Sequence, residues 1–171
     1  MRIRPPFWPA IALATLVMAL DQASKWWILK DVMAVPEVKE IFPFFNLVLA
    51  WNRGVSFGLF NNGSALNAWI LPILTGGIAI GLIIWLSKID DKKLAFAIGL
   101  VIGGAIGNLI DRIVHGAVVD FLDVHVAGYH WPAFNVADSA ICIGAAVLIL
   151  DSLFSSDEKL KKNENEAKRK P

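Results

Sequence analysis

Apolar residues dominate four stretches of the chain, each about as long as a membrane-spanning helix. A helix needs about 20 mostly apolar residues to cross the hydrocarbon core of a bilayer. Four segments come close to this length, at residues 8–29, 65–86, 94–113 and 137–154. The pattern therefore predicts a membrane protein with an all-α core, built as a bundle of four transmembrane helices.

Two longer connections separate these spans, at residues 30–64 and 114–136. The first contains "IFPFFNLVLAWNRGVSFGLF", which is rich in aromatic and β-branched residues and is interrupted by Pro43 and Gly54. This composition predicts short strands that form a small β-sheet on the membrane surface. Ser64 then offers an N-cap, either for a short surface helix or for the second span itself. The sequence alone leaves both alternatives open.

The composition agrees with one domain that lies in a membrane. Of the 171 residues, 56% are hydrophobic and 18% are charged. A soluble domain would usually carry roughly 25% charged residues. We expect residues 1–156 to form a single membrane domain, and the charged residues 157–171 to form a disordered tail. The single Cys142 excludes an internal disulfide.

The basic residues predict the orientation of the chain in the membrane. If both termini are cytoplasmic, 11 of the 16 Lys and Arg residues lie on the cytoplasmic side, at the N-terminus, in the 87–93 turn and in the tail. Cytoplasmic segments of membrane proteins carry such an excess of Lys and Arg. We therefore expect the two longer connections, and the small sheet, on the extracytoplasmic side.

Four aspartates are expected at one depth near the outer leaflet. Asp21 and Asp111 lie about 20 and 25 Å along their helices, given a rise of 1.5 Å per residue. Asp138 opens the fourth span, and Asp120 lies in the connection that leads to it. Ionisable residues at such depth are costly and mark functional sites by default. The sequence therefore predicts one site at the outer leaflet.

Helical spacing indicates which polar neighbours can meet. Asp21 and Lys25 are four residues apart, so they can pair, and Lys25 can extend towards the lipid headgroups as an interfacial anchor. Asn108 lies three residues before Asp111 and four before Arg112, so its amide can orient either side chain. Glycines at four-residue spacing also predict close helix packing. These glycines are Gly77, Gly81, Gly99, Gly103 and Gly107.

Three kinds of function would use carboxylates at this position. Two carboxylates that share a proton can activate water and protonate a leaving group, so amide hydrolysis would need no cofactor. A metal site is an alternative, because three histidines fall in the second connection, but no typical ligand motif is present and we expect no metal. A small proton-coupled membrane carrier is the other alternative, which inverted repeats or a midplane site would favour.

Five short motifs resemble those of the bacterial lipoprotein signal peptidases, also called signal peptidase II. The motifs are "DQASKW" (21–26), "WNRGVSFG" (51–58), "GNLIDR" (107–112), "VVDF" (118–121) and "FNVADSAI" (134–141). They occur in the family's order, and the resemblance covers residues from about 8 to 154. It implies an inner-membrane aspartic endopeptidase that cleaves prolipoproteins before a diacylglyceryl-modified cysteine, without a cofactor.

The resemblance also implies roles for individual residues. The catalytic pair falls on Asp120 and Asp138. Supporting or substrate-binding positions fall on Asp21, Lys25, Asn52, Asn108, Asp111, Arg112 and Asn135. Of these, we expect Asn52, Arg112 and Asn135 to hold the substrate backbone, and Asp111 with Asn108 to brace Arg112.

The resemblance implies partners as well. The sheet and the short surface helix would form a cradle and a lid over the site. The expected partners are diacylglyceryl-modified prolipoproteins and membrane lipids, with no nucleic acid, and we expect a monomer.

Overall fold

Four long helices form the body of the molecule in a computed structural model that describes residues 3–33, 35–54 and 65–167. The helices are α1 (Phe7–Trp27), which continues into a short π-helix η1 (Ile28–Val32), α2 (Ala65–Leu86), α3 (Lys92–His115) and α4 (Val136–Ala167). The parts long and apolar enough to span a membrane are Phe7–Val32, Trp69–Leu86, Lys92–His115 and Val136–Phe154. The four predicted spans are therefore confirmed.

Helix α3 lies at the centre of the bundle and packs against α1, α2 and α4. Glycines allow the closest of these contacts. An added Cβ would lie 2.7 Å from the carbonyl oxygen of Ala10 at Gly99 and 2.5 Å from that of Ala14 at Gly103. The predicted packing role is thus confirmed for these two glycines of α3.

The glycines of α2 differ from this prediction. At Gly77 and Gly81 an added Cβ would meet no atom of the described residues within 4 Å. Both face away from the bundle, so the packing role expected for them is wrong. Spacing places residues on one helix face but does not tell which neighbour covers that face.

Defined caps fix both ends of α3. Asp91 accepts hydrogen bonds from the backbone N–H groups of Lys93 and Leu94, at 2.7 and 3.0 Å. These bonds stabilise the carboxylate and hold the pKa of Asp91 below its usual value. At the other end Gly116 adopts a left-handed conformation, with φ of 70°, which suits glycine. This turn sends the chain directly from α3 into a strand.

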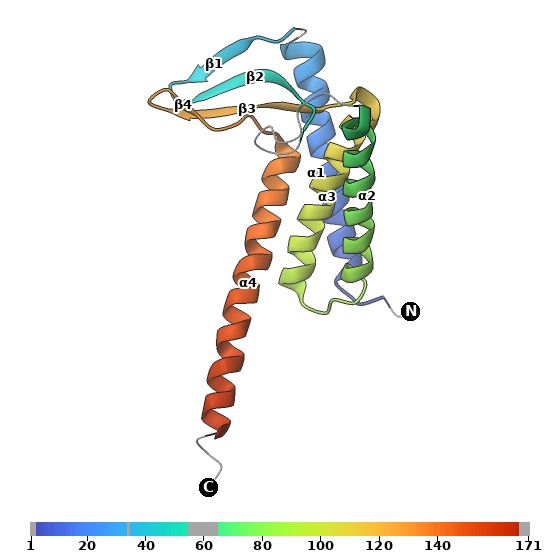
Figure 1. Cartoon of the computed structure of the whole chain (residues 1–171), viewed down its shortest axis with the longest axis vertical. Coiled ribbons are helices and arrows are strands. Elements are labelled where there is room, and N and C mark those ends of the chain that lie inside the picture. Colours follow the sequence, from blue (N-terminus) through green and yellow to red (C-terminus); the bar gives the residue numbers. More distant parts are fainter. Residues whose placement is uncertain (1–2, 34, 55–64, 168–171) are drawn as a thin grey trace.

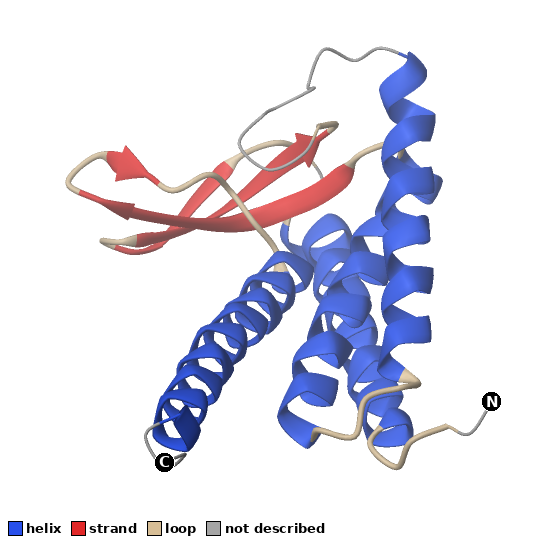
Figure 2. Ribbon diagram, turned by 60° about the horizontal axis from the view of Figure 1, so that its bottom comes forward, coloured by secondary structure: helices blue, strands red, loops and turns tan. Residues whose placement is uncertain are grey.

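A four-stranded antiparallel sheet covers one end of the bundle, here called the sheet end (Figures 1 and 2). Its strands, in spatial order, are β1 (Val38–Phe42), β2 (Phe45–Asn52), β3 (Val118–Val126) and β4 (Tyr129–His130). The small sheet predicted from the first connection is confirmed. The second connection supplies the other two strands, which the sequence analysis did not predict.

A compact apolar cluster joins the sheet to the bundle. Ile28 and Met33, at the end of the first span, pack with Leu49 of β2 and with Val119 and Phe121 of β3. Since Asp120 lies between two of these buried residues, the cluster also fixes the position of its backbone. In the register of β2 and β3, Asp120 lies opposite Ala50.

The structure favours one of the two alternatives for the element after Ser64, and it differs from the predicted start of the C-terminal tail. Residues 65–86 form one continuous helix, which favours the second span over a separate surface helix as the element that follows Ser64. Residues 55–64, to which the expected lid also belongs, lie outside the described residues. Helix α4 continues to Ala167. Residues 157–167, which were expected to be disordered, are therefore helical. Lys, Glu and Ala favour helix, and α4 already provides the nucleus.

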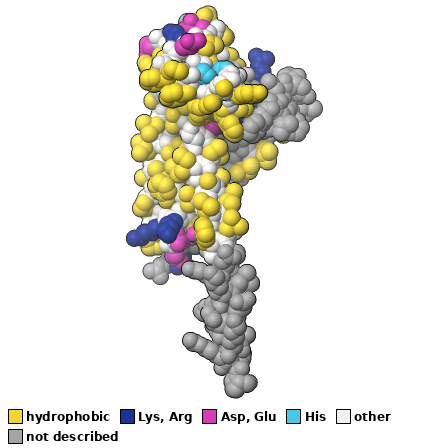
Figure 3. Space-filling model, turned by 90° about the vertical axis from the view of Figure 1, so that its left-hand side faces the viewer, with side chains coloured by type: hydrophobic (Ala, Val, Ile, Leu, Met, Phe, Trp, Pro, Cys, Tyr) yellow, Lys and Arg dark blue, Asp and Glu magenta, His cyan; other side chains and the backbone are white. Residues whose placement is uncertain are grey.

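The surface of the helical shaft is apolar (Figure 3). Hydrophobic side chains cover its length, whereas charged side chains gather near its two ends. Large apolar residues are widely exposed on it, including Trp8, Ile73 and Ile149. Cys142 of α4 is also exposed. A soluble protein rarely presents so much apolar surface, but a lipid bilayer would cover it.

Candidate active site

A cluster of polar side chains lies at the sheet end, where α1, α3 and α4 meet β2 and β3. Its fully buried members are Asp21, Lys25, Asn108, Asp111, Asp120 and Asn135. Asn52, Arg112 and Asp138 are half-buried. The structure therefore brings all nine predicted site residues into one region of the molecule.

Asn135 connects Asp120 and Asp138, here called the aspartate pair. Its Nδ2 donates to Asp120 Oδ1 at 2.7 Å, and its Oδ1 accepts from the backbone N–H of Asp138 at 2.9 Å. Asn135 is completely buried. These bonds orient the carboxylate of Asp120 and hold the backbone at Asp138. The expectation that Asn135 holds the substrate backbone stays a prediction.

Asn108 orients Asp138 from the opposite side. Its Nδ2 donates to Asp138 Oδ1 at 2.8 Å, and its Oδ1 accepts from Lys25 Nζ at 3.0 Å. Asn108 meets Arg112 only through its backbone carbonyl, at 3.4 Å from Nη1. The expectation that its amide braces Arg112 is therefore wrong.

Asp120 accepts one hydrogen bond on each carboxylate oxygen. Asn52 Nδ2 donates to Oδ2 at 3.0 Å, opposite the bond from Asn135 to Oδ1. Asn52 in turn accepts from the backbone N–H of Gly54 at 3.1 Å, which fixes its orientation. Burial and the neighbouring charge of Asp138 raise the pKa of Asp120 to about 7, although both asparagines oppose this shift. The aspartate pair can therefore hold a proton near neutral pH.

Arg112 lies beside the aspartate pair with part of its guanidinium unpaired. Its Nη2 donates to the carbonyl oxygen of Gly54 at 3.1 Å. Its Nε is buried and finds no hydrogen-bond partner among the described residues. Asp111 makes its short contacts with Lys25 and the backbone of Val119, so the support of Arg112 expected from its carboxylate is electrostatic and not a hydrogen bond.

Lys25 lies at the centre of the cluster. Its Nζ is 2.8 Å from Asp21 Oδ2, 2.8 Å from Asp111 Oδ2 and 3.0 Å from Asn108 Oδ1. These three acceptors use all three protons of the ammonium group. The predicted pairing with Asp21 is confirmed. The interfacial-anchor interpretation is wrong, because Lys25 is only 2% exposed.

Gln22 is a member of the cluster that the sequence analysis missed. Its Nε2 donates to Asp111 Oδ1 at 2.9 Å and to the carbonyl oxygen of Gly107 at 3.1 Å. It thereby ties α1 to α3 beside Lys25. Its position next to Asp21, at the same depth in an apolar span, was the available signal.

Two histidines of the second connection, His125 and His130, pair with each other and with Asp123, while the ring of His115 lies against Trp51. His130 Nδ1 is 2.9 Å from Asp123, and its ring stacks on His125. Burial raises the pKa of Asp123, but hydrogen bonds from His130 and Asn46 outweigh it and leave the pKa below its usual value. In the described part of the chain, no three His, Cys, Asp or Glu residues are grouped as metal ligands. The absence of a metal requirement stays a prediction.

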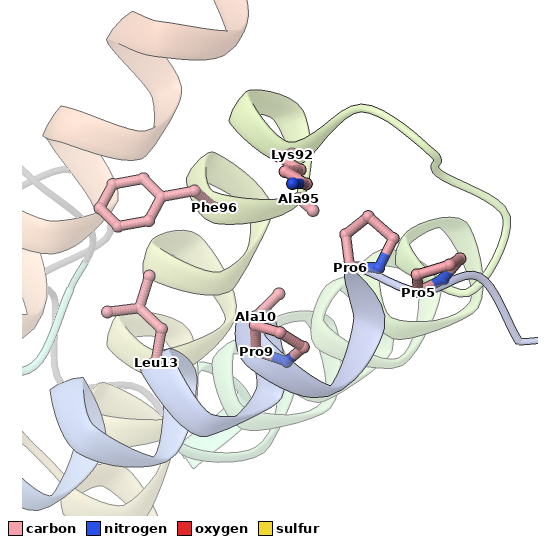
Figure 4. A pocket seen from close by; sticks show the side chains of 8 residues that line it. All are labelled: Pro5, Pro6, Pro9, Ala10, Leu13, Lys92, Ala95 and Phe96. Carbon is pink, nitrogen blue, oxygen red and sulfur yellow. The ribbon is translucent and has the colours of Figure 1, made fainter.

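A cavity of about 340 Å³ lies between the starts of α1 and α3 (Figure 4), at the end of the bundle opposite the sheet (Figure 1). It is lined by Pro5, Pro6, Pro9, Ala10, Leu13, Lys92, Ala95 and Phe96. Because these side chains include no acid, histidine or hydroxyl group, the cavity lacks the groups needed for hydrolysis. The polar cluster at the sheet end is therefore the candidate active site.

Known proteins resemble this chain over most of its length. A family model described as signal peptidase (SPase) II matches residues 13–154. The chain is 45% identical over 150 residues to the lipoprotein signal peptidase of Polynucleobacter necessarius, covering 85% of this chain and 90% of that protein. It is 50% identical over 149 residues to the lipoprotein signal peptidase of Ralstonia nicotianae, covering 85% and 84%.

A solved structure shows the same fold. It is described as a bacterial membrane enzyme, and it superposes with a TM-score of 0.80 at 31% identity, covering 93% of this chain and 96% of that one. The fold and these likenesses define an integral membrane protease. The chain belongs to the signal peptidase II family. The family prediction is confirmed, and membership of a family of hydrolases decides against the membrane carrier.

Proposed function

We propose that this protease removes signal peptides from prolipoproteins by cleaving the bond before a diacylglyceryl-modified cysteine. The aspartate pair activates the attacking water. One observation carries this proposal: Asn135 holds Asp120 of β3 and Asp138 of α4 together through hydrogen bonds to both. The names of the relatives support the substrate class.

The aspartate pair supplies both an acid and a base. Because the pKa of Asp120 is raised to about 7, we assign the shared proton at rest to Asp120. Ionised Asp138 then accepts a proton from water, and the resulting hydroxide attacks the carbonyl carbon while Asp120 protonates the carbonyl oxygen. When the tetrahedral intermediate collapses, its C–N bond breaks and Asp138 returns a proton to the leaving amine. Asp120 recovers its proton from the new carboxyl group.

Arg112 and Asn52 are the supporting residues proposed to touch the substrate. Both are half-buried, in contrast to the fully buried Asn135. The unpaired Nε of Arg112 is a donor beside the aspartate pair, and a substrate carbonyl would satisfy it. Asn52 already holds Asp120 and the backbone at Gly54, so it links the substrate position to the acid.

The proposed orientation places the aspartate pair near the outer leaflet. The start of α1, the turn from α2 to α3 and the far end of α4 all lie opposite the sheet end (Figure 1). With the basic residues on the cytoplasmic side, the sheet faces outward. The acyl chains of a lipidated substrate would stay in the bilayer, so its scissile bond would lie at this depth. We propose that the enzyme acts as a monomer in contact with membrane lipids.

Cleavage of a defined substrate tests the function. The purified enzyme, supplied with a diacylglyceryl-modified prolipoprotein, is expected to release the signal peptide and leave the lipidated cysteine as the new N-terminus, as measured by mass spectrometry. A substrate with serine in place of that cysteine cannot be lipidated and should remain intact. Cleavage at another bond, or equal cleavage of both substrates, would contradict the proposal.

Cysteine labelling tests the orientation. In a background with Cys142→Ala, a membrane-impermeant thiol reagent is expected to label Tyr129→Cys from outside intact cells, because Tyr129 is 85% exposed on the sheet. Lys92→Cys, at the opposite end of the bundle, should react only after permeabilisation. Labelling of the Lys92 position in sealed cells would reverse the orientation.

The rate of cleavage should fall on the alkaline side with an apparent pKa of about 7, the value of Asp120. Above that pH Asp120 loses its proton, and none remains for the carbonyl oxygen. Because the hydrogen bond from Asn52 lowers the pKa of Asp120, Asn52→Ala should move this limb to higher pH. Asp123→Asn, which changes a carboxylate of the same strand, should leave the limb in place. A profile of kcat/KM that stays flat to pH 9 would refute the assignment.

A further inference from the structure

A carboxylate of α3 holds the backbone next to Asp120. The N–H of Val119, which directly precedes Asp120, donates to Asp111 Oδ2 at 3.0 Å. Val119 is completely buried, so water cannot replace this acceptor. The position of Asp120 on β3 therefore depends on Asp111 of α3.

A carboxylate of α1 holds the backbone next to Asp138 in the same way. The N–H of Ala137, which directly precedes Asp138, donates to Asp21 Oδ1 at 2.9 Å. This N–H belongs to the first turn of α4, where backbone donors have no partner within the helix. A negative charge is also favourable at a helix N-terminus. The position of Asp138 therefore depends on Asp21, which lies 116 residues before Ala137 in the chain.

Lys25 joins these two carboxylates. Its Nζ lies 2.8 Å from Asp21 Oδ2 and 2.8 Å from Asp111 Oδ2. Two carboxylates buried this close would otherwise repel each other, so the ammonium group is needed to keep both in place. Movement of Lys25 would loosen both backbone contacts together.

These three side chains cannot touch a substrate directly. Asp21 is completely buried, and Lys25 and Asp111 are each 2% exposed. Gly107 closes the space beside them, because a Cβ at this position would lie 2.5 Å from Asp21 Oδ2. Any effect of the three on cleavage must therefore pass through other groups.

We propose that Asp21, Lys25 and Asp111 form a positioning clamp that sets the separation of the aspartate pair. This inference rests on the function proposed above, because the clamp matters only if Asp120 and Asp138 act together. The clamp residues are positioning residues, and their contribution belongs to kcat and not to substrate affinity.

The two carboxylates of the clamp use their oxygens differently. Oδ2 of Asp111 accepts from both Lys25 Nζ and the N–H of Val119. In Asp21 the two oxygens divide these contacts: Oδ2 accepts from Lys25 Nζ, and Oδ1 accepts from the N–H of Ala137. An asparagine has one acceptor oxygen. Asp111→Asn can therefore keep both contacts if Gln22 turns its amide and gives up its bond to the Gly107 carbonyl, whereas Asp21→Asn must lose one of its own two contacts.

Kinetics of the full-length enzyme on the lipidated prolipoprotein test this asymmetry. Asp21→Asn should lower kcat on the order of 100-fold, the size of effect expected when reacting groups are misplaced by about 1 Å, and Asp111→Asn by less than about tenfold. KM should change by less than about twofold in both, because neither residue reaches the substrate. Equal losses in the two variants, or a loss that appears in KM, would overturn the clamp.

Removal of the ammonium group gives a second readout. The positive charge of Lys25 lowers the pKa of Asp120, so Lys25→Met should lower kcat and move the alkaline limb of the pH profile to higher pH. Lys30→Met removes an exposed cation just beyond the same helix and should change neither. An unmoved limb in Lys25→Met would contradict the link from Lys25 to Asp120.

Amide hydrogen exchange tests the clamp without any substrate. Asp21→Asn should speed exchange at the start of α4, around Ala137, whereas Asp111→Asn should leave Val119 protected. This outcome separates the two proposals. Wild-type enzyme that fails to cleave refutes the proposed function, while unchanged exchange at Ala137 in Asp21→Asn refutes the clamp.

Discussion

Asparagine at either position of the aspartate pair is expected to remove nearly all cleavage from a folded enzyme. Asp120→Asn and Asp138→Asn keep the size and shape of the side chain but cannot exchange the proton that the pair shares. For groups that act as one unit, a single replacement costs at least about 10⁴-fold in kcat. Each variant should still insert into the membrane.

The surrounding amides allow these variants to fold. At position 120 an asparagine can keep its oxygen towards buried Asn135, and half-buried Asn52 can turn its own amide if it gives up its bond from Gly54. The measurements are kcat for each variant and the midpoint of thermal unfolding in detergent. Asp123→Asn is the matched control, because it removes a buried carboxylate of the same strand outside the site. Substantial turnover by either folded variant would remove that aspartate from the pair.

Gly107→Ala should be almost as damaging, although it adds a single methyl group. The new Cβ would lie 2.5 Å from Asp21 Oδ2 and 3.1 Å from Asp21 Cγ. Asp21 must then move away from Lys25 and from the N–H of Ala137. Overpacking of this kind costs about 1–3 kcal/mol, and breaking a buried ion pair costs about 3–5 kcal/mol. We expect a lower thermal midpoint together with a loss of kcat.

Gly81→Ala is the control for that substitution. Gly81 lies on a spanning helix like Gly107, but within the described part of the chain an added Cβ would meet nothing within 4 Å. Alanine also favours helix over glycine. Stability and cleavage should therefore be unchanged or slightly improved. Equal damage from both substitutions would mean that glycine spacing alone matters, and not the contact with Asp21.

The sequence predicted the spans well, and it predicted that the aspartates lie at one level of the bundle, because both depend on quantities that add along one helix. Length and apolar content define a span, and a fixed rise per residue gives the depth of Asp21 or Asp111. The resemblance then singled out Asp120 and Asp138. Neither the helical pattern nor the resemblance predicted that Asn135 connects strand β3 to helix α4.

The sequence did not predict which polar residues are buried. Lys25 follows Asp21 at the spacing of a pair, and the same spacing fits a lysine that extends to the headgroups or one that points inward. Its burial depends on α3, which brings Asp111 and Asn108 to it from more than 80 residues away. The complete burial of Asn135 was missed for the same reason. Tertiary packing, which no local pattern reports, decides these cases.

The strands of the second connection were missed for a different reason. The segment "VVDFLDVHV" carries β-branched residues typical of a strand, but it also contains two aspartates, a residue type that is depleted in strands. The structure shows that β3 pairs with β2 and so places Asp120 opposite Ala50 and beside Asn52.

The most direct test of the central claim is a double-mutant cycle on the aspartate pair. The rates of single-turnover cleavage of the lipidated prolipoprotein would be measured for the wild type, Asp120→Asn, Asp138→Asn and the double variant. If the two carboxylates act as one unit, the double variant should be within about tenfold of either single variant. A double variant slower than both by the product of the two single losses would show that Asp120 and Asp138 act independently.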